Sequence, residues 1–479
     1  MNFRNVIFIL GWVMNMEAVL MLPSMVTGLI YREEAVTALL WSALLCLAVG
    51  IPMSRIRRRD THFRIREGFV AVALCWIAIS VMGGLPFLFS GTFTNPVDAL
   101  FETMSGFTTT GASVMTDVEV VPKCIIFWRS FTHWIGGMGV LVFLLSLFRM
   151  TGGSHINLMK AESPGPSVGR LLPTIQSTAK ILYMIYFGMT VLMVLLLLAG
   201  RMPLFDALTI SFGTAGTGGF GIKNDSLGSY TVYQQVVVTV FMLLFGVNFN
   251  VYFFMLARKW KNAFRCEELW WYLGIVAVSI LTIGWNIRGM FDNLGQAMQQ
   301  SAFQVASIIT TTGYATTDFN LWPETSRTIL VMLMFVGACA GSTGGGMKVS
   351  RLVILLKTMK KELSQFLHPN RVARIRMDGK VVEHETIRSI NVFMVAYLLI
   401  FSLSVLVLSF DGTDLITNFT AVAATFNNIG PGLEQAGPAT NFAMFSNVSK
   451  LVMTFDMLAG RLEIFPVLLL FVRDTWRKF

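Results

Sequence analysis

The sequence predicts an all-α integral membrane protein with about ten transmembrane helices. Four helix, pore-loop, helix repeats surround one axis in a pseudo-fourfold arrangement, and two extra N-terminal helices precede them. Three observations support this prediction. Hydrophobic residues make up 54% of the 479 residues, Lys and Arg gather in a few short loops, and a Gly-rich motif recurs along the chain.

The composition requires lipid as the main solvent. Only 13% of the residues are charged, which is too few to coat a soluble globule of this size. One bilayer crossing takes about 20 helical residues. Apolar runs that reach this length alone or with their flanks occupy residues 6–30, 70–79, 125–148, 181–199, 236–257, 273–283, 329–338, 392–410 and 464–472.

The basic residues indicate which side of the membrane each loop faces. Loops rich in Lys and Arg are 55–66, 258–265, 357–376 and 473–478. By the positive-inside rule they are cytoplasmic, which places this multi-pass chain in the cell inner membrane. The alternate connections are poor in basic residues and face outward; they surround Asp117, Asp225, Asp318 and Glu434. The net charge of +10 therefore reports topology, and we expect no nucleic-acid partner.

The chain divides into a helix pair and four repeats, all in one membrane domain. In the first two repeats, Asp98 precedes Gly111 by the same number of residues as Asp206 precedes Gly219. The predicted limits are 1–66 for the N-terminal pair, 67–170, 171–265 and 266–384 for repeats one to three, and 385–479 for repeat four. The second helix of repeat three is predicted to be broken.

The recurring motif has the chemistry of a potassium filter. It reads Thr-Thr-Thr-Gly at residues 108–111 and 310–313, Thr-Gly-Gly at 217–219, and Asn-Asn-Ile-Gly at 427–430. Non-helical backbone at membrane depth is tolerated where it lines a water-filled path. Rings of backbone carbonyls can replace the hydration shell of potassium, and glycine allows the backbone to turn them toward one axis. Each preceding half-helix would point its negative carboxyl end at that axis.

Further motifs show a resemblance to a known family. These are Trp128-Arg129-Ser130 with Trp134 to Gly139, the run Gly341 to Lys348, and Gly460-Arg461-Leu462-Glu463. With the four filters, they make the chain similar over its full length to the superfamily of Trk, Ktr and HKT cation transporters. The two extra N-terminal helices favour the TrkH branch of potassium-uptake subunits.

The resemblance implies potassium as the transported ion, held by backbone carbonyls of the filter. The implied filter residues are Thr110, Gly111, Gly218, Gly219, Thr312, Gly313, Ile429 and Gly430. Sodium-preferring HKT members often have Ser at the position of Gly111, so glycine there favours potassium. Asn427, Asn428 and Gly218 depart from the Thr-rich pattern, which predicts uneven fourfold coordination and a selectivity that is modest.

The resemblance also implies a gate, a second copy and a regulator. We expect an intramembrane loop to close the path below the filter together with an arginine. The gate residues are Gly341, Ser342, Thr343, Gly344, Gly345, Gly346 and Arg461. The implied partners are the lipid bilayer, a second copy in a homodimer, and a cytoplasmic TrkA-type ring that binds nucleotide. This chain itself has no expected organic cofactor.

Charged residues within the spans have a functional and a structural interpretation. Arg461 shares its predicted depth with the Gly-rich break, which favours a role in gating, although a pair with Asp456 would make it structural. For Arg129, Glu17, Asp456 and Glu463 the structural interpretation, a buried pair, is favoured.

Two rival functions were weighed against ion conduction. A secondary transporter of another cation or a small organic solute would also use broken helices at the midplane. An enzyme would need acid, base or metal-ligand clusters at membrane depth, and the sequence offers none. The run 216–221 satisfies G-x-G-x-x-G and 341–348 is similar to a phosphate-binding loop, but neither follows a strand, and Met347 replaces the required lysine. The sequence is consistent both with passive flow of potassium and with potassium transport coupled to protons or sodium.

Overall fold

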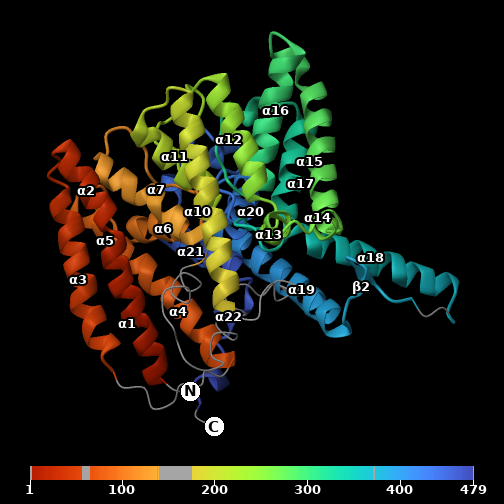
Figure 1. Cartoon of the computed structure of the whole chain (residues 1–479), viewed down its shortest axis with the longest axis horizontal. Helices are drawn as coiled ribbons and strands as arrows, with labels where there is room; N and C mark the ends of the chain where they lie inside the picture. Colours follow the sequence, from red (N-terminus) through yellow and green to blue (C-terminus); the bar gives the residue numbers. More distant parts are fainter. Residues whose placement is uncertain (1–2, 57–64, 138, 140–174, 371–372, 478–479) are drawn as a thin grey trace.

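The chain folds almost entirely into helices (Figure 1). The computed structural model describes residues 3–56, 65–137, 139, 175–370 and 373–477. Strand in this part of the chain is confined to one antiparallel hairpin, β1 (Arg376–Met377) and β2 (Lys380–Val381). The predicted all-α fold is confirmed.

The two extra N-terminal helices form a closely packed pair at one edge of the molecule (Figure 1). α1 (Phe3–Leu20) continues through a break into α2 (Leu22–Tyr31), and α3 (Val36–Ser54) returns beside α1. A Cβ on Gly11 of α1 would lie 2.7 Å from the backbone of Met53 in α3. Glycine therefore allows the two helices to approach each other this closely.

Each repeat consists of a first helix, a pore helix and a second helix. The first helices are α4 (Ile65–Gly83), α10 (Ile175–Ala199), α15 (Glu267–Asn286) and α19 (His384–Leu408). The pore helices are α6 (Pro96–Phe107), α11 (Leu204–Gly216), α16 (Leu294–Ile309) and α20 (Leu415–Phe426). The second helices begin with α7 (Lys123–Gly137), α12 (Val232–Phe245), α17 (Glu324–Val336) and α21 (Asn447–Arg461).

The second helices of repeats two, three and four are all broken. α12 meets α13 (Phe249–Leu256) at 90°, a non-helical run separates α17 from α18 (Val349–Leu367), and α21 is followed by the single turn α22 (Phe465–Leu468). Residues with positive φ occur at the last two breaks, among them Gly337, Lys348 and Ile464. The break in repeat three was predicted from its glycines, whereas those in repeats two and four were not.

The short elements connect these helices and end the chain. They are α5 (Leu85–Phe89), α14 (Trp260–Phe264) and the 3-10 turns Arg288–Met290, Phe319–Leu321, Ser409–Asp411, Glu434–Ala436, Phe442–Met444 and Arg473–Thr475. The predicted limits near residues 266 and 385 lie at the starts of α15 and α19, and that near 67 lies in the first turn of α4. The limit near 170 is outside the described residues.

Helix length and composition account for the predicted number of spans. In the described part of the chain, 6 helical stretches are long and apolar enough to cross a membrane, and the bent pair of α12 and α13 adds one more. The short helices α7, α17 and α21 begin the second helices of the other three repeats. Counting these as crossings gives the predicted set of about ten.

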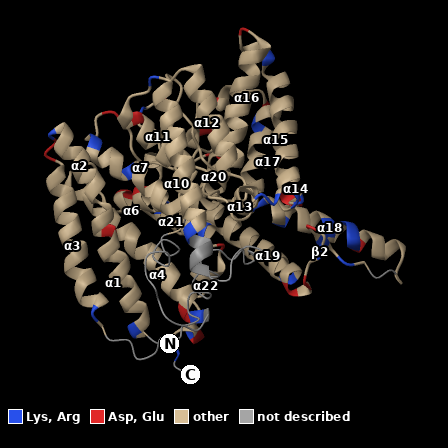
Figure 2. Ribbon diagram, in the orientation of Figure 1, with Lys and Arg blue, Asp and Glu red and all other residues tan. Residues whose placement is uncertain are grey.

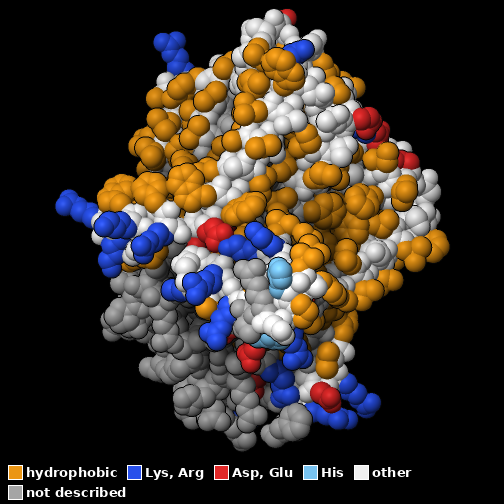
Figure 3. All heavy atoms as spheres, turned by 90° about the vertical axis from the view of Figure 1, so that its right-hand side faces the viewer, with side chains coloured by type: hydrophobic (Ala, Val, Ile, Leu, Met, Phe, Trp, Pro, Cys, Tyr) orange, Lys and Arg blue, Asp and Glu red, His pale blue; other side chains and the backbone are white. Residues whose placement is uncertain are grey.

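The surface agrees with a chain held in lipid. Figure 2 shows charged residues mostly near helix ends and loops, with Lys and Arg concentrated around α14 and α18. On the face in Figure 3, hydrophobic side chains cover most of the upper part, and Lys and Arg gather along its lower margin. On the first helices of the repeats, Leu195, Val278, Val395 and Leu399 are exposed. Lipid is the solvent that such side chains require.

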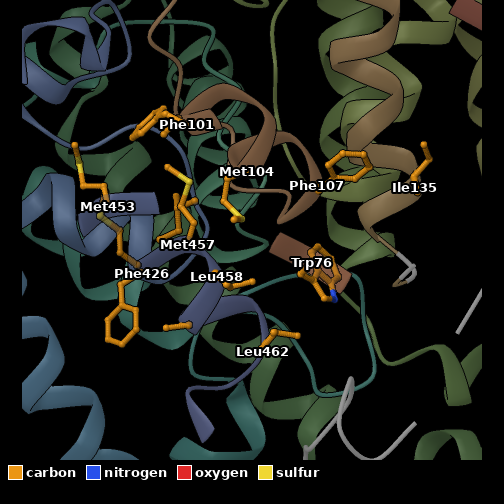
Figure 4. Close-up of a cluster of buried hydrophobic side chains, with 14 of the residues drawn as sticks. Trp76, Phe101, Met104, Phe107, Ile135, Phe426, Met453, Met457, Leu458 and Leu462 are labelled. Atoms are coloured by element: carbon orange, nitrogen blue, oxygen red, sulfur yellow. The ribbon is translucent and has the colours of Figure 1, made fainter. Parts of the chain in front are cut away.

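The core packs the pore helices against the last second helix. Figure 4 shows Met453, Met457 and Leu458 of α21 between the pore helices of repeats one and four. At Gly460, an added Cβ would overlap the carbonyl of Phe426, the last residue of α20. α21 is thus held directly against the end of a pore helix.

Candidate ion pathway

The pore helices are held at their amino ends so that their carboxyl ends meet at the centre. Three of them begin with a side-chain cap: Asn95 accepts from Val97 N (3.0 Å), Asn293 from Gln296 N (2.8 Å), and Asp414 from Thr417 N (3.0 Å). These caps satisfy backbone donors at the amino ends. The partial negative charge of each carboxyl end then lies next to its filter, where it favours a cation.

The same backbone turn follows each pore helix. A residue with positive φ comes first, namely Thr109, Thr217, Thr311 and Asn428, and a glycine with positive φ follows two residues later. The residue between them donates its N–H to a carbonyl five residues back, at 2.8 Å in every repeat. These bonds are Thr110 to Ser105, Gly218 to Gly213, Thr312 to Ser307, and Ile429 to Ala424. The four motifs, which differ in sequence, therefore adopt one conformation.

The four turns form a closed ring. A Cβ on Gly111 would overlap the carbonyl oxygen of Gly218 in repeat two, one on Gly219 that of Thr312, and one on Gly313 that of Ile429. The ring closes at Gly430, where a Cβ would lie 3.0 Å from the carbonyl oxygen of Thr110 in repeat one. All eight predicted filter residues are thus brought together, in the cyclic order of repeats one, two, three and four.

This ring offers oxygen ligands to a dehydrated cation. The carbonyls of Thr110, Gly218, Thr312 and Ile429 lie at the equivalent position of each turn, each against the glycine of a neighbouring repeat. Carbonyl oxygens in such a ring replace the hydration shell of an alkali cation. Side chains line this part of the path very little, because glycine occupies the next position in every repeat.

The fourth filter uses its asparagines to contact its neighbours. Asn428 donates to the hydroxyl of Thr110 in repeat one (2.9 Å) and to the carbonyl of Met457 (2.9 Å), and Asn427 accepts from the hydroxyl of Tyr397 (3.0 Å). The departure from the Thr-rich pattern therefore leaves the backbone turn intact and changes the lateral contacts of the filter.

A cavity of about 180 Å³ adjoins the ring on the side of the predicted outer loops. All four filter glycines line it, as do Arg129, Lys223 and Asn224. Asn224 also donates to the carboxylate of Asp117 (2.9 Å), and this bond lowers the pKa of Asp117. Asp117 is therefore ionised at neutral pH. It lies between the lining residues Thr116 and Val118, whereas the charged residues that line the cavity, Arg129 and Lys223, are positive.

The predicted gate residues 341–346 form one loop beside the filter, between α17 and α18. The N–H of Gly345 donates to the hydroxyl of Thr311 (2.7 Å), and a Cβ on Gly344 would lie 3.0 Å from the carbonyl oxygen of Thr310. The other side of the loop contacts the break in repeat two, since Phe249 N donates to Gly341 O (3.0 Å). The loop thus connects the third filter to a second broken helix.

Glu268 on α15 holds both ends of this loop. Its Oε1 accepts from Ala340 N (2.7 Å), before the glycine run, and from Ser350 N (2.9 Å), in the first turn of α18. The side chain of Lys348 donates to the carbonyl of Gly344 within the loop. Sequence reasoning missed Glu268, because an acid near the start of a span resembles an ordinary flanking charge.

Arg461 at the end of α21 contacts the filter, the loop and repeat one together. Its Nη1 donates to the hydroxyl of Thr109 (3.2 Å) and to the carbonyl of Thr343 (3.0 Å). Its Nη2 donates to the carbonyls of Gly136 and Gly137 (3.0 Å for the latter) at the end of α7. The predicted neighbourhood of Arg461 and the Gly-rich loop is therefore present.

The alternative structural pair of Arg461 with Asp456 is not formed. The Oδ1 of Asp456 accepts from Ser404 (2.8 Å), and its Oδ2 has no hydrogen-bond partner within the described residues. Two other charges predicted to be structural are paired: Arg129 with Glu102 at 2.6 Å, and Glu463 with Arg351. For buried Glu17, no hydrogen bond of the carboxylate occurs within the described part of the chain.

Comparisons with known proteins point to one family. The family model described as TrkH, cation transport protein, matches residues 36–285 and 269–478. The potassium uptake protein TrkH of Salmonella typhimurium is 35% identical, and that of Vibrio parahaemolyticus is 36% identical, each over 100% of both chains. The crystal structure of the potassium transporter TrkH from Vibrio parahaemolyticus superposes with a TM-score of 0.90 at 32% identity, again over 100% of both chains.

Proposed function

Because this chain belongs to the TrkH family of cation transport proteins, we propose that it takes up potassium by conducting the ion through the ring of its four filters. The single observation that supports this mechanism most is the closed cyclic contact of Gly111, Gly219, Gly313 and Gly430 with the carbonyls of the neighbouring repeats. Such a ring coordinates a single-file cation, whereas a solute carrier would need a larger site for its substrate.

The pore helices support a preference for cations. Their carboxyl ends face the ring, and the partial negative charge there favours positive charge along the path. We therefore place the chain among transport proteins rather than enzymes, with potassium as its cargo.

The gate in this proposal consists of residues 341–346 and Arg461. Its support is geometric: the loop contacts the third filter through Gly345, and the Arg461 guanidinium contacts both the loop at Thr343 and the first filter at Thr109. A positive charge beside the path raises the free energy of a passing cation. Movement of the loop and this charge away from the axis would open the path.

A cytoplasmic regulator and a second copy complete the proposal. Its support is the family membership and the basic inner segments, of which residues 357–367 belong to the protruding helix α18 (Figure 2). A TrkA-type nucleotide-binding ring docked on these segments would transmit its state to α18, which starts directly after the gate loop.

Reversal potentials of the purified protein in planar bilayers test the proposal. Under opposed potassium and sodium gradients, we expect a reversal potential displaced from that of sodium toward that of potassium, and radioactive rubidium should enter vesicles that contain the protein. Protein-free bilayers are the control. A reversal potential that ignores the potassium gradient would overturn the proposal.

A further inference from the structure

We propose that the buried ion pair of Glu102 and Arg129 is a clamp that positions the first two filters and thereby sets ion selectivity. This inference rests on the proposed conduction through the filter ring. Both side chains are buried, with 0% and 2% of the Glu102 and Arg129 side chains exposed. A charged pair this deep is costly to bury, so its contacts carry information about what it holds.

Glu102 holds the segment that leaves the first filter. It lies on the pore helix α6, and its Oε2 accepts from Val114 N at 2.9 Å. Its Oε1 accepts from the Ser113 hydroxyl (2.9 Å) and from Arg129 Nε (2.6 Å). Val114 follows Gly111 by three residues, so this carboxylate fixes the chain directly after the filter glycine.

Arg129 extends the clamp to the second filter. It lies on α7 and donates through Nη2 to the Ser113 hydroxyl (3.0 Å) in repeat one and through Nη1 to the carbonyl of Gly221 (2.9 Å) in repeat two. Its guanidinium carbon lies 3.6 Å from the ring centre of Phe220. The planar fork of arginine is suited to such directed, simultaneous contacts.

Phe220 is held from its other side as well. His133, one turn after Arg129 on α7, stacks on Phe220 with ring centres 4.1 Å apart. Phe220 directly follows the filter residue Gly219. The second filter is therefore fixed through a side chain of repeat two that lies between two side chains of repeat one.

The carboxylate of the clamp has no counterpart at the equivalent position of the other three repeats. The positions that correspond to Glu102, at the same distance before each filter glycine, are Ile210, Gln304 and Ala421. Gln304 donates to the Thr316 hydroxyl at 3.4 Å, and in repeat four Thr420 accepts from Leu433 N at 2.9 Å. Neutral hydrogen bonds hold these segments at the positions that correspond to Glu102. Repeats three and four are joined by the ion pair of Arg327 with Glu434, four residues after Gly430.

A charged clamp is stiffer than these neutral contacts. Hydrogen bonds between charged groups are roughly twice as strong as neutral ones, and burial increases the difference. Loss of the charge should let the first two filters relax outward. A softer ring could contract around the smaller sodium ion, so its preference for potassium over sodium would fall.

The test measures the potassium-to-sodium permeability ratio in bilayers, normalised to folded protein. For Arg129→Gln we expect a fall of about tenfold, equivalent to about 1.4 kcal/mol, and for Glu102→Gln a similar fall. Arg129→Lys keeps the charge but not the fork, and should give an intermediate ratio. Arg288→Gln is the control, because Arg288 lies in the turn after α15 and contacts the ring of Trp285 (3.9 Å) rather than a filter segment.

Two comparisons separate the possible outcomes. Ser113→Ala keeps the charges of Glu102 and Arg129 but removes the hydroxyl that both side chains contact. It should lower the permeability ratio by about threefold, or roughly 0.7 kcal/mol. If the charge variants do not fold, this variant alone tests the clamp. An unchanged ratio in Ser113→Ala and in each charge variant that folds overturns the clamp. Gly111→Ser tests the filter itself: if it alters the ratio while the clamp variants do not, only the clamp fails.

A purely electrostatic role at the outer cavity gives a different result. Arg129 also lines that cavity, so removal of its charge alone would raise the conductance of both ions and leave their ratio unchanged. That outcome would also overturn the positioning role.

Discussion

At the filter ring, glycine is required because there is no room for a side chain and because the backbone has positive φ. Gly111, Gly219 and Gly313 have φ between 74° and 85°, a region that costs other residues free energy. Each also lies where a Cβ would overlap a carbonyl oxygen of the next repeat. A side chain at any of the three must displace an oxygen of the ring, so substitution acts on the ion ligands themselves.

The first residue-scale prediction concerns ion choice. Gly111→Ser should raise sodium permeability relative to potassium by about tenfold, because the new Cβ displaces the Gly218 carbonyl. Reversal potentials under mixed gradients provide the ratio. Ala112→Ser, one residue later at a position that lines the outer cavity, is the control. An unchanged ratio in a folded, conducting Gly111→Ser protein would count against the filter assignment.

The second residue-scale prediction concerns Arg461. Arg461→Ala should increase potassium flux per folded molecule several-fold and loosen dependence on the partner. Two like unit charges about 4 Å apart repel each other by about 4 kcal/mol at an effective dielectric constant of about 20, so a guanidinium beside the path opposes a passing cation. Rubidium flux into vesicles measures the effect. Lower thermal stability without a gain in flux would show that the contacts with Gly136, Gly137 and Thr343 serve folding alone.

At the scale of the elements, the broken helices of repeats two and three share one hydrogen-bonded unit. Cys339 N donates to Gly246 O (3.0 Å) and Phe249 N to Gly341 O (3.0 Å). Thr343 adds a bond to the carbonyl of Phe245 (3.3 Å). Backbone groups freed by one break are thus satisfied by the other, as the membrane interior requires. Movement of the loop 341–346, the proposed gate, would therefore involve the bend between α12 and α13.

Glu268 provides the test at this scale. Glu268→Gln should raise basal flux several-fold, since the loss of a charged acceptor weakens both anchors of the loop by about 1 to 3 kcal/mol in total. Glu267→Gln is the matched control, because the adjacent Glu267 pairs with Lys357 at 2.6 Å and does not contact the loop ends. Equal flux in the two variants would remove Glu268 from the gate.

The sequence was sufficient to predict the elements that local patterns encode. Apolar runs, repeated Thr and Gly spacing and the glycine run at 341–346 predicted the helices, the four filters and the break in repeat three. Local sequence patterns do not show which residues far apart in the chain come into contact. The contacts of Arg461 with Gly136, of Glu268 with Ser350 and of Glu102 with Arg129 depend on tertiary packing between helices far apart in the sequence. The bend after α12 carries no proline, so its sequence reads as one continuous span.

At the scale of the whole molecule, the prediction of a cytoplasmic partner depends on the basic inner surface. The hairpin β1–β2 is attached to the start of α15, where Asp378 accepts from Glu267 N at 2.7 Å, and Lys357 of α18 donates to the carbonyl of Arg376 (2.8 Å). A basic surface fixed in this way is suited to docking an acidic partner.

Neutralising Arg371, Arg374 and Arg376 should weaken co-purification of a TrkA-type partner at least several-fold, because charges at the edge of an interface mainly affect association. Basal conduction should remain. Arg371 lies outside the described residues. Neutralising Arg258, Lys259 and Lys261 on the neighbouring inner loop serves as the comparison. If neither set changes binding, the partner docks elsewhere on the chain.

The cyclic order of the four filters within one polypeptide also affects how ion choice can evolve. In a channel made of four identical subunits, one codon change alters every quadrant of the pore at once. Here a codon change alters a single quadrant, as the Asn-Asn-Ile of repeat four illustrates beside the Thr-rich repeats. A single mutation therefore changes the contacts of the ion with only one of the four filters. A lineage can adjust its sodium tolerance gradually while three intact quadrants continue to supply the cell with potassium.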